Sequence, residues 1–166
     1  MALRSTGPGT ARSRSAWPAV LVVLIGACSA AQPTSASLAS EPVLQPLPGE
    51  VELADVRVQP RRGRIGVPGR DGVVERVVAL GLTPSAAADL VQQRHAGRYA
   101  FRRVDLGRGS AGAVTVELRG TSPTGATVVV TSSSTPPVPL YGGPDEVQPA
   151  PPDRVTSVVI TVVSPQ

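Results

Sequence analysis

The sequence contains no lysine or asparagine and only one cysteine, one histidine, one methionine and one tryptophan. A protein metal site needs several cysteine, histidine or carboxylate ligands at set spacings, and a single histidine and cysteine do not supply them. A phosphate-binding P-loop and serine–lysine catalysis both require a lysine, so neither is predicted. Aromatic residues make up 2% of the chain. The core must therefore be largely aliphatic, and the abundance of valine favours a sheet.

The single cysteine, Cys28, follows a basic start and a short apolar run. Arg4, Arg12 and Arg14 lie upstream, and no acidic residue occurs before Glu41. The apolar run has about a dozen residues, whereas a membrane-spanning helix needs ~20. A basic start, a short apolar run and small residues before a cleavage site are typical of a secretory signal peptide.

The end of this run, Ile25-Gly26-Ala27-Cys28, resembles the lipobox of bacterial lipoproteins. The resemblance covers residues 1–28. It implies that residues 1–27 are a signal peptide, that Cys28 becomes the lipidated N-terminus, and that the protein is anchored to the outer face of the cell membrane. Lysine and asparagine have A-rich codons, so their absence suggests a GC-rich genome and a resemblance to actinobacterial lipoproteins. The alternative is a plain secretory signal, with Cys28 pairing between chains.

The mature chain divides by composition into a linker and one domain. Residues 28–49 are rich in Ala, Ser, Thr, Gln and Pro, and Glu41 is their only charge. They are predicted to form a flexible tether, which as a coil of ~20 residues would span roughly 25 Å. Residues 50–166 are predicted to form a single small domain. Within it, residues 136–152 contain seven prolines and are predicted to be a loop, because proline cannot occupy a central strand.

Apolar spacing predicts a strand followed by two helices in the first half of the domain. The first strand covers residues 51–58, with a phase slip near Ala54-Asp55. Residues 73–80 have apolar side chains at helical spacing, with Asp71 as a possible cap, and predict the first helix. Thr83 and Pro84 are typical N-cap and first-turn residues, so a second helix is predicted up to residue 96.

The second half of the domain predicts four strands. They cover residues 99–106, 114–118, 127–130 and 155–163, with a hairpin loop at 120–125. Alternation in the last strand places Val158, Ile160 and Val162 on one face, so we expect them in the core. The fold class predicted is α+β, with two short helices packed on one face of a mainly antiparallel sheet of about five strands.

No arrangement of catalytic residues is recognisable in the sequence. His95 is predicted near the end of the second helix, where an imidazolium would favour the helix dipole. Ser110 lies in a glycine-rich turn that lacks the spacing of a nucleophile elbow. Asp145, Glu146 and Asp153 lie in or beside the proline-rich segment and are expected in solvent. We therefore predict a non-enzymatic protein with no catalytic or metal-binding residues and no cofactor.

Charge is unevenly distributed along the mature chain. Residues 57–108 carry 11 arginines and four acidic residues, a net charge of +7, whereas residues 28–56 carry four acidic residues and no arginine. Arginine is well suited to binding phosphate or carboxylate. The alternative is a solvated surface neutralised by the acidic ends of the chain. The candidate anion-binding residues are Arg61, Arg62, Arg64, Arg70, Arg98, Arg102 and Arg103.

These observations together predict a membrane-tethered envelope lipoprotein that acts as a non-enzymatic binding or interaction module. Its predicted partners are the membrane, through the lipid anchor, and an anionic lipid, a wall polymer or an acidic protein surface. Nucleic acid is not expected as a partner of an exported protein. One alternative is a carrier of lipid or another apolar ligand, which would need a cavity between sheet and helices. The other is a hydrolase that uses the carboxylates.

Overall fold

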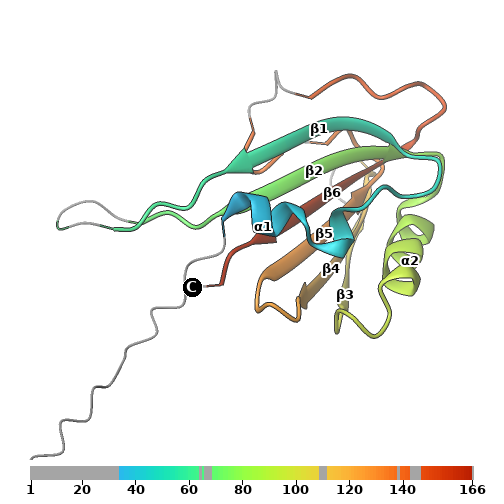
Figure 1. The fold of residues 1–166 in the computed structure, drawn as a ribbon. Helices are drawn as coiled ribbons and strands as arrows, with labels where there is room; N and C mark the ends of the chain where they lie inside the picture. Colours follow the sequence, from blue (N-terminus) through green and yellow to red (C-terminus); the bar gives the residue numbers. More distant parts are fainter. Residues whose placement is uncertain are drawn as a thin grey trace, which may run out of the picture. The chain divides into compact units, whose positions relative to one another are not determined.

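The computed structural model describes residues 34–63, 65, 69–108, 112–137, 139–142 and 147–165. In this part of the chain, six strands form one antiparallel sheet in the order β1-β2-β6-β5-β4-β3 (Figure 1). The strands are β1 (Val51–Val58), β2 (Val73–Leu80), β3 (Arg102–Arg108), β4 (Val114–Thr121), β5 (Thr127–Ser133) and β6 (Thr156–Val163). The helices are α1 (Ser35–Ala39), the short 3₁₀ helix η1 (Pro42–Leu44) and α2 (Pro84–Arg94). The α+β class is confirmed, with six strands rather than five.

The predicted helix over residues 73–80 is wrong, because this segment is strand β2. All eight of its residues are buried, since β2 lies between β1 and β6 and both faces of the sheet are covered over it. A strand buried on both faces does not alternate between apolar and polar residues. Its valines then match helical spacing by chance, and only their β-branching favours a strand.

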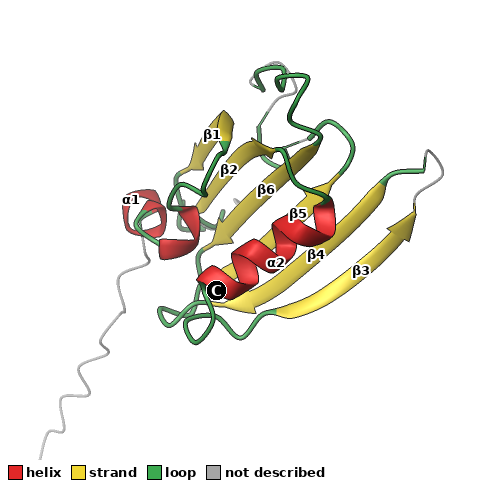
Figure 2. Ribbon diagram, turned by 90° about the vertical axis from the view of Figure 1, so that its right-hand side faces the viewer, coloured by secondary structure: helices red, strands yellow, loops and turns green. Residues whose placement is uncertain are grey.

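Helix α2 and strands β4, β5 and β6 agree with the prediction, whereas β3 begins at Arg102 rather than at the predicted residue 99. The Oγ1 of Thr83 accepts a hydrogen bond from the backbone N–H of Ala86 at 3.3 Å, and Pro84 begins the helix. Residues 122–126 form the turn between β4 and β5, where the Ser122 N–H donates to the Ala126 carbonyl at 2.8 Å. The alternating strands therefore pair as a meander from β3 to β5, with α2 packed on β4, β5 and β6 (Figure 2).

Strand β6 lies in the middle of the sheet, between β2 and β5. Val158, Ile160 and Val162 are fully buried, so their predicted place in the core is confirmed. They pack against α1, η1 and α2 in the larger of two apolar clusters. The smaller cluster includes Val77 and Val159, which point to the opposite face of the sheet.

Residues 35–47 are not a flexible tether, contrary to the prediction for residues 28–49. They form α1 and η1, and Leu38, Val43, Leu44 and Leu47 are buried against the sheet on the same face as α2. Burial of each such side chain contributes about 1.5–3 kcal/mol. The folded domain therefore includes residues 35–47, ahead of the predicted start at residue 50.

The proline-rich segment crosses the other face of the sheet. Its described residues contain no strand, as predicted. The Gln148 N–H donates to the Leu53 carbonyl of β1 at 3.0 Å, and Val147 packs in the smaller apolar cluster. The segment thus leaves the end of β5, reaches β1 and returns to begin β6.

Candidate functional site

The chain that follows the predicted lipidation site enters the described structure at Thr34. Cys28 itself lies outside the described residues. Thr34 caps α1, because its Oγ1 accepts a hydrogen bond from the Ser37 N–H at 3.2 Å. Positions 28 and 34 are six residues apart in the sequence. The link between the predicted anchor and the folded domain is therefore short.

The candidate arginines fall into two groups at opposite edges of the sheet. The group in the connection between β1 and β2 comprises Arg61, Arg62 and Arg70. The group between the end of α2 and β3 comprises Arg98, Arg102 and Arg103. Four strands separate β1 from β3, so the two edges are about 24 Å apart at ~4.8 Å per strand. Arg64 lies outside the described residues. The described candidate arginines of residues 57–108 thus do not form one continuous basic surface.

The first group lies on a basic arm, here defined as residues 59–63, 65 and 69–72, which projects beyond the sheet (Figure 1). Arg61 and Arg70 pair across the arm, each donating its backbone N–H to the other's carbonyl at 2.8 Å. The side chains of Arg61, Arg62 and Arg70 are exposed. No carboxylate of the described residues lies within 4.0 Å of their guanidinium nitrogens. The arm also contains Asp71, so its three described arginines and one carboxylate give a net charge of +2. The arm therefore presents positive charge to solvent.

The second group is partly neutralised by acidic neighbours. Arg103 forms ion pairs with Asp105 at 2.9 Å and with Asp89 at 2.5 Å, and it also donates to the Ser85 hydroxyl at 2.7 Å. These bonds hold α2 on β3 and give Arg103 a structural role. Arg102 is exposed on β3, opposite Arg119 of β4. Arg98 is also exposed, and neither it nor Arg102 forms an ion pair with a described residue. The basic arm has three such arginines and the second group two, so the arm is the better candidate for binding an anion.

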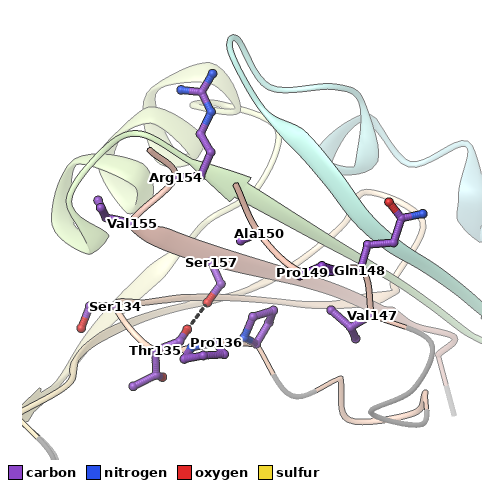
Figure 3. A pocket seen from close by; sticks show the side chains of 11 residues that line it. Ser134, Thr135, Pro136, Val147, Gln148, Pro149, Ala150, Arg154, Val155 and Ser157 are labelled. Carbon is purple, nitrogen blue, oxygen red and sulfur yellow. Dashed lines mark hydrogen bonds between the residues drawn. The ribbon is translucent and has the colours of Figure 1, made fainter. Parts of the chain in front are cut away.

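A pocket of about 590 Å³ lies between the proline-rich segment and the ends of β5 and β6 (Figure 3). Proline, valine and alanine line most of it, and Ser157 bridges it by donating to the Thr135 carbonyl at 2.6 Å. The guanidinium of Arg154 points away from Ser157 and Thr135 in Figure 3. The volume lies within the ~300–1,000 Å³ of small-molecule sites. The pocket suits a small, mainly apolar molecule.

His95 ends α2, as predicted, but not as an exposed cation. It is 3% exposed and contacts the Tyr99 ring edge to face, with centroids 5.7 Å apart. Burial lowers its pKa, and the nearby charges of Arg94 and Arg98 lower it further. The neutral imidazole is therefore favoured near pH 7, and the expected charge–dipole role is wrong. Its Nε2 has no hydrogen-bond partner among the described residues.

The other groups considered for catalysis are not brought to His95. Ser110, Asp145 and Glu146 lie outside the described residues. Asp153 is exposed, and its carboxylate lies 3.7 Å from the Nε of Arg154. The described part of the chain therefore provides no observation in favour of a hydrolase.

A buried polar cluster, which the sequence did not reveal, joins the start of η1 to the rest of the domain. Glu41 is 6% exposed, and its carboxylate accepts hydrogen bonds from the Tyr99 hydroxyl at 2.7 Å and the Thr124 hydroxyl at 2.5 Å. Burial raises the pKa of Tyr99, and its hydrogen bond to Glu41 raises it further. A lone acidic residue in a nearly uncharged stretch was the only sequence signal. The cluster satisfies its own carboxylate, which indicates a structural role.

A second buried carboxylate lies on the opposite face of the sheet. Glu75 of β2 is fully buried, and its Oε2 accepts hydrogen bonds from the Thr161 hydroxyl and the Leu140 N–H, both at 3.2 Å. Its Oε1 has no partner among the described residues. Burial raises the Glu75 pKa, although these two hydrogen bonds oppose the rise. Glu75 thus fastens the proline-rich segment to the sheet.

Comparison with known proteins identifies no relative from which a function could be inferred. No protein-family model, curated protein or solved structure matches this sequence. None of the helices in the described ranges has the length and apolar character needed to cross a membrane.

Proposed function

We propose that the protein is an envelope lipoprotein, tethered through Cys28 to the outer face of the cell membrane, and that its domain is a non-enzymatic interaction module. The tether rests on the resemblance of Ile25-Gly26-Ala27-Cys28 to a lipobox. The interaction rests on one observation, the exposed arginines of the basic arm, which lack acidic partners in the described structure. Their proposed partner is an anionic component of the envelope.

Labelling with a fatty acid tests the tether. Cells supplied with a labelled fatty acid should label the wild-type protein but not Cys28→Ala. Cys28→Ala removes the residue that would carry the acyl chains, and two such chains are needed for stable anchoring. The variant should therefore also leave the membrane fraction. Equal labelling of both proteins, or membrane retention of Cys28→Ala, contradicts the proposal.

Charge reversal on the basic arm tests the interaction. Arg61→Glu/Arg62→Glu should reduce binding to anionic vesicles or wall fragments, and raising the salt concentration should weaken wild-type binding because exposed charges are screened over ~8 Å. The matched control is Arg98→Glu/Arg102→Glu, which changes the net charge equally at the opposite edge of the sheet. Equal losses in both variants would show that net charge, rather than the arm, determines binding.

The pocket beneath the proline-rich segment supports a second candidate, a carrier of a small apolar ligand. Its volume of about 590 Å³ and its proline, valine and alanine lining are the favouring observations. The carrier hypothesis predicted a cavity between the sheet and the helices, whereas this pocket lies on the opposite face of the sheet. Mass spectrometry of the protein purified from its native membrane should then find a bound apolar molecule. Its amount should fall in Ala150→Trp, which fills the pocket, and an unchanged amount would reject this candidate.

A further inference from the structure

We infer that the basic arm lies on the anionic phospholipid surface of the same membrane to which the chain is tethered. This inference rests on the proposed lipidation of Cys28 and identifies the anionic partner of the proposed function. Three features of the described structure carry it. They are the short link to the anchor, the place where this link joins the domain, and the chemistry of the arm.

The link is short because residues 35–47 are packed on the sheet. Only the six-residue interval from Cys28 to Thr34 remains outside the described domain. Fully extended, it spans at most ~20 Å, and as a flexible coil it spans about 13 Å on average. The attraction of anionic lipid falls off over a Debye length of ~8 Å. At the average coil length, the domain surface nearest Thr34 therefore lies within about two Debye lengths of the membrane, and at full extension within about two and a half.

That surface is the base of the basic arm. Gly72 ends the arm, and a methyl group at this position would lie 3.3 Å from Leu38 Cδ1 of α1 and 3.2 Å from Pro60 Cδ. Leu38 of α1 therefore lies beside Gly72, where the arm leaves the sheet (Figure 1). Arg61 and Arg62 follow Pro60 directly, so they lie within ~7 Å of this contact at ~3.3 Å per residue. The anchor and the arginines are thus brought to one region of the domain.

The arm combines the two kinds of side chain that suit a lipid surface. Its arginines provide forked donors for phosphate oxygens, and each basic residue near an anionic membrane strengthens binding by about fivefold. Beyond them, Ile65 is fully exposed, at 107% of the reference area. An aliphatic side chain gains nothing from a hydrophilic wall polymer but is stabilised on entering a bilayer interface. This pairing favours phospholipid over the other anions of an envelope.

A tryptophan reporter tests the contact directly. Trp17 is the only tryptophan and precedes Cys28, so the mature lipoprotein carrying Ile65→Trp has a single tryptophan, whose emission is excited selectively over that of the two tyrosines. The purified lipoprotein is reconstituted into vesicles of brominated phosphatidylcholine, with or without phosphatidylglycerol. Bromine should quench the emission in the anionic vesicles and much less in the neutral ones. Leu106→Trp is the control, because Leu106 is 55% exposed on the edge strand β3, and its emission should stay unquenched in both.

Charge reversal and competition separate the possible failures. In the Ile65→Trp background, Arg61→Glu/Arg62→Glu should abolish the quenching while the protein still floats with the vesicles. A protein that floats with neutral vesicles but shows no quenching in anionic ones would overturn the inference and leave the anchor intact. A change in emission that needs anionic wall fragments instead of lipid would overturn it as well. A protein that does not float with neutral vesicles lacks the anchor, and both proposals then fail.

Discussion

The ion-pair network around Arg76 should determine whether the N-terminal segment stays packed on the sheet. Arg76 of β2 is 8% exposed. It forms ion pairs with Glu50, whose side chain is 8% exposed, and with Glu52 at 2.8 Å. It also donates to the Leu44 carbonyl at 3.2 Å. Glu50 in turn accepts a hydrogen bond from the Leu47 N–H at 2.8 Å. One guanidinium therefore ties η1 and the start of β1 to the second strand.

The magnitude follows from the burial of both partners. Arg76→Met keeps much of the side-chain volume but leaves the Glu50 carboxylate buried with only the Leu47 N–H as a donor. Removing one member of a buried pair costs about 3–5 kcal/mol, a large share of the ~5–15 kcal/mol that stabilises a typical domain. The double variant Arg76→Met/Glu50→Gln no longer buries an unpaired charge. It should lose at least about 1 kcal/mol less than the two single changes combined.

Urea unfolding followed by circular dichroism measures these free energies, on the chain carrying Cys28→Ala. Hydrogen exchange at the backbone amides of residues 41–47 reports whether the segment opens locally before the domain unfolds. Arg57→Met is the control, because the Arg57–Asp55 pair on the neighbouring strand is 54% and 33% exposed and such pairs contribute at most about 1 kcal/mol. A loss below about 1 kcal/mol in Arg76→Met, or additive single effects, would refute the reasoning.

Three further changes test other parts of the fold. Truncation after Asp153 removes β6 from the middle of the sheet and should abolish the cooperative transition in urea; a truncated chain that melts like wild type would contradict this. Glu75→Gln should raise the melting temperature at neutral pH. The pKa of Glu75 is raised in the folded protein above its unfolded value of ~4.3. Wild type therefore loses stability as the pH rises from ~4.3 through the folded-state pKa, because the buried carboxyl group ionises. The melting temperatures of wild type and Glu75→Gln should therefore converge in acid. A difference in melting temperature that does not depend on pH would contradict this prediction. Tyr99→Phe removes one of the donors to buried Glu41 and should cost about 1–3 kcal/mol in urea unfolding, whereas an unchanged midpoint would show that the hydroxyl contributes nothing.

The sequence predicted those elements whose signal is local. Thr83 and Pro84 identify the start of α2 because capping needs only neighbouring residues. Alternation in β4 and β6 predicts strands because each has a regular pattern over eight residues or fewer. The phase slip near Ala54 corresponds to the observed register shift between Glu52 and Ala54. These features depend on interactions that the segment itself contains.

The features that were missed depend on partners far away in the chain. Val73 to Leu80 form a strand because β6, more than 70 residues later, pairs with them. The candidate arginines form one run in sequence, but the chain passes through β2 and α2 before β3 takes the opposite edge of the sheet. The candidate arginines of residues 57–108 therefore lie at two opposite edges of the sheet. Composition alone does not reveal which edge a strand will occupy.

The packing of the N-terminal segment changes the expected distance between the domain and the proposed lipid anchor. Its low charge and small residues are typical of a linker, and only the surface made by β2 and α2 gives Leu38, Val43 and Leu44 a place to be buried. As a free coil of ~20 residues, it would hold the domain roughly 25 Å from the anchor, about three Debye lengths away. At that distance the arginines of the basic arm would gain little from an anionic membrane. With residues 35–47 docked, positions 28 and 34 are six residues apart, and Thr34 caps α1 beside the base of the arm. In the proposed lipoprotein, the contacts of α1 and Arg76 would therefore affect membrane binding without touching the lipid.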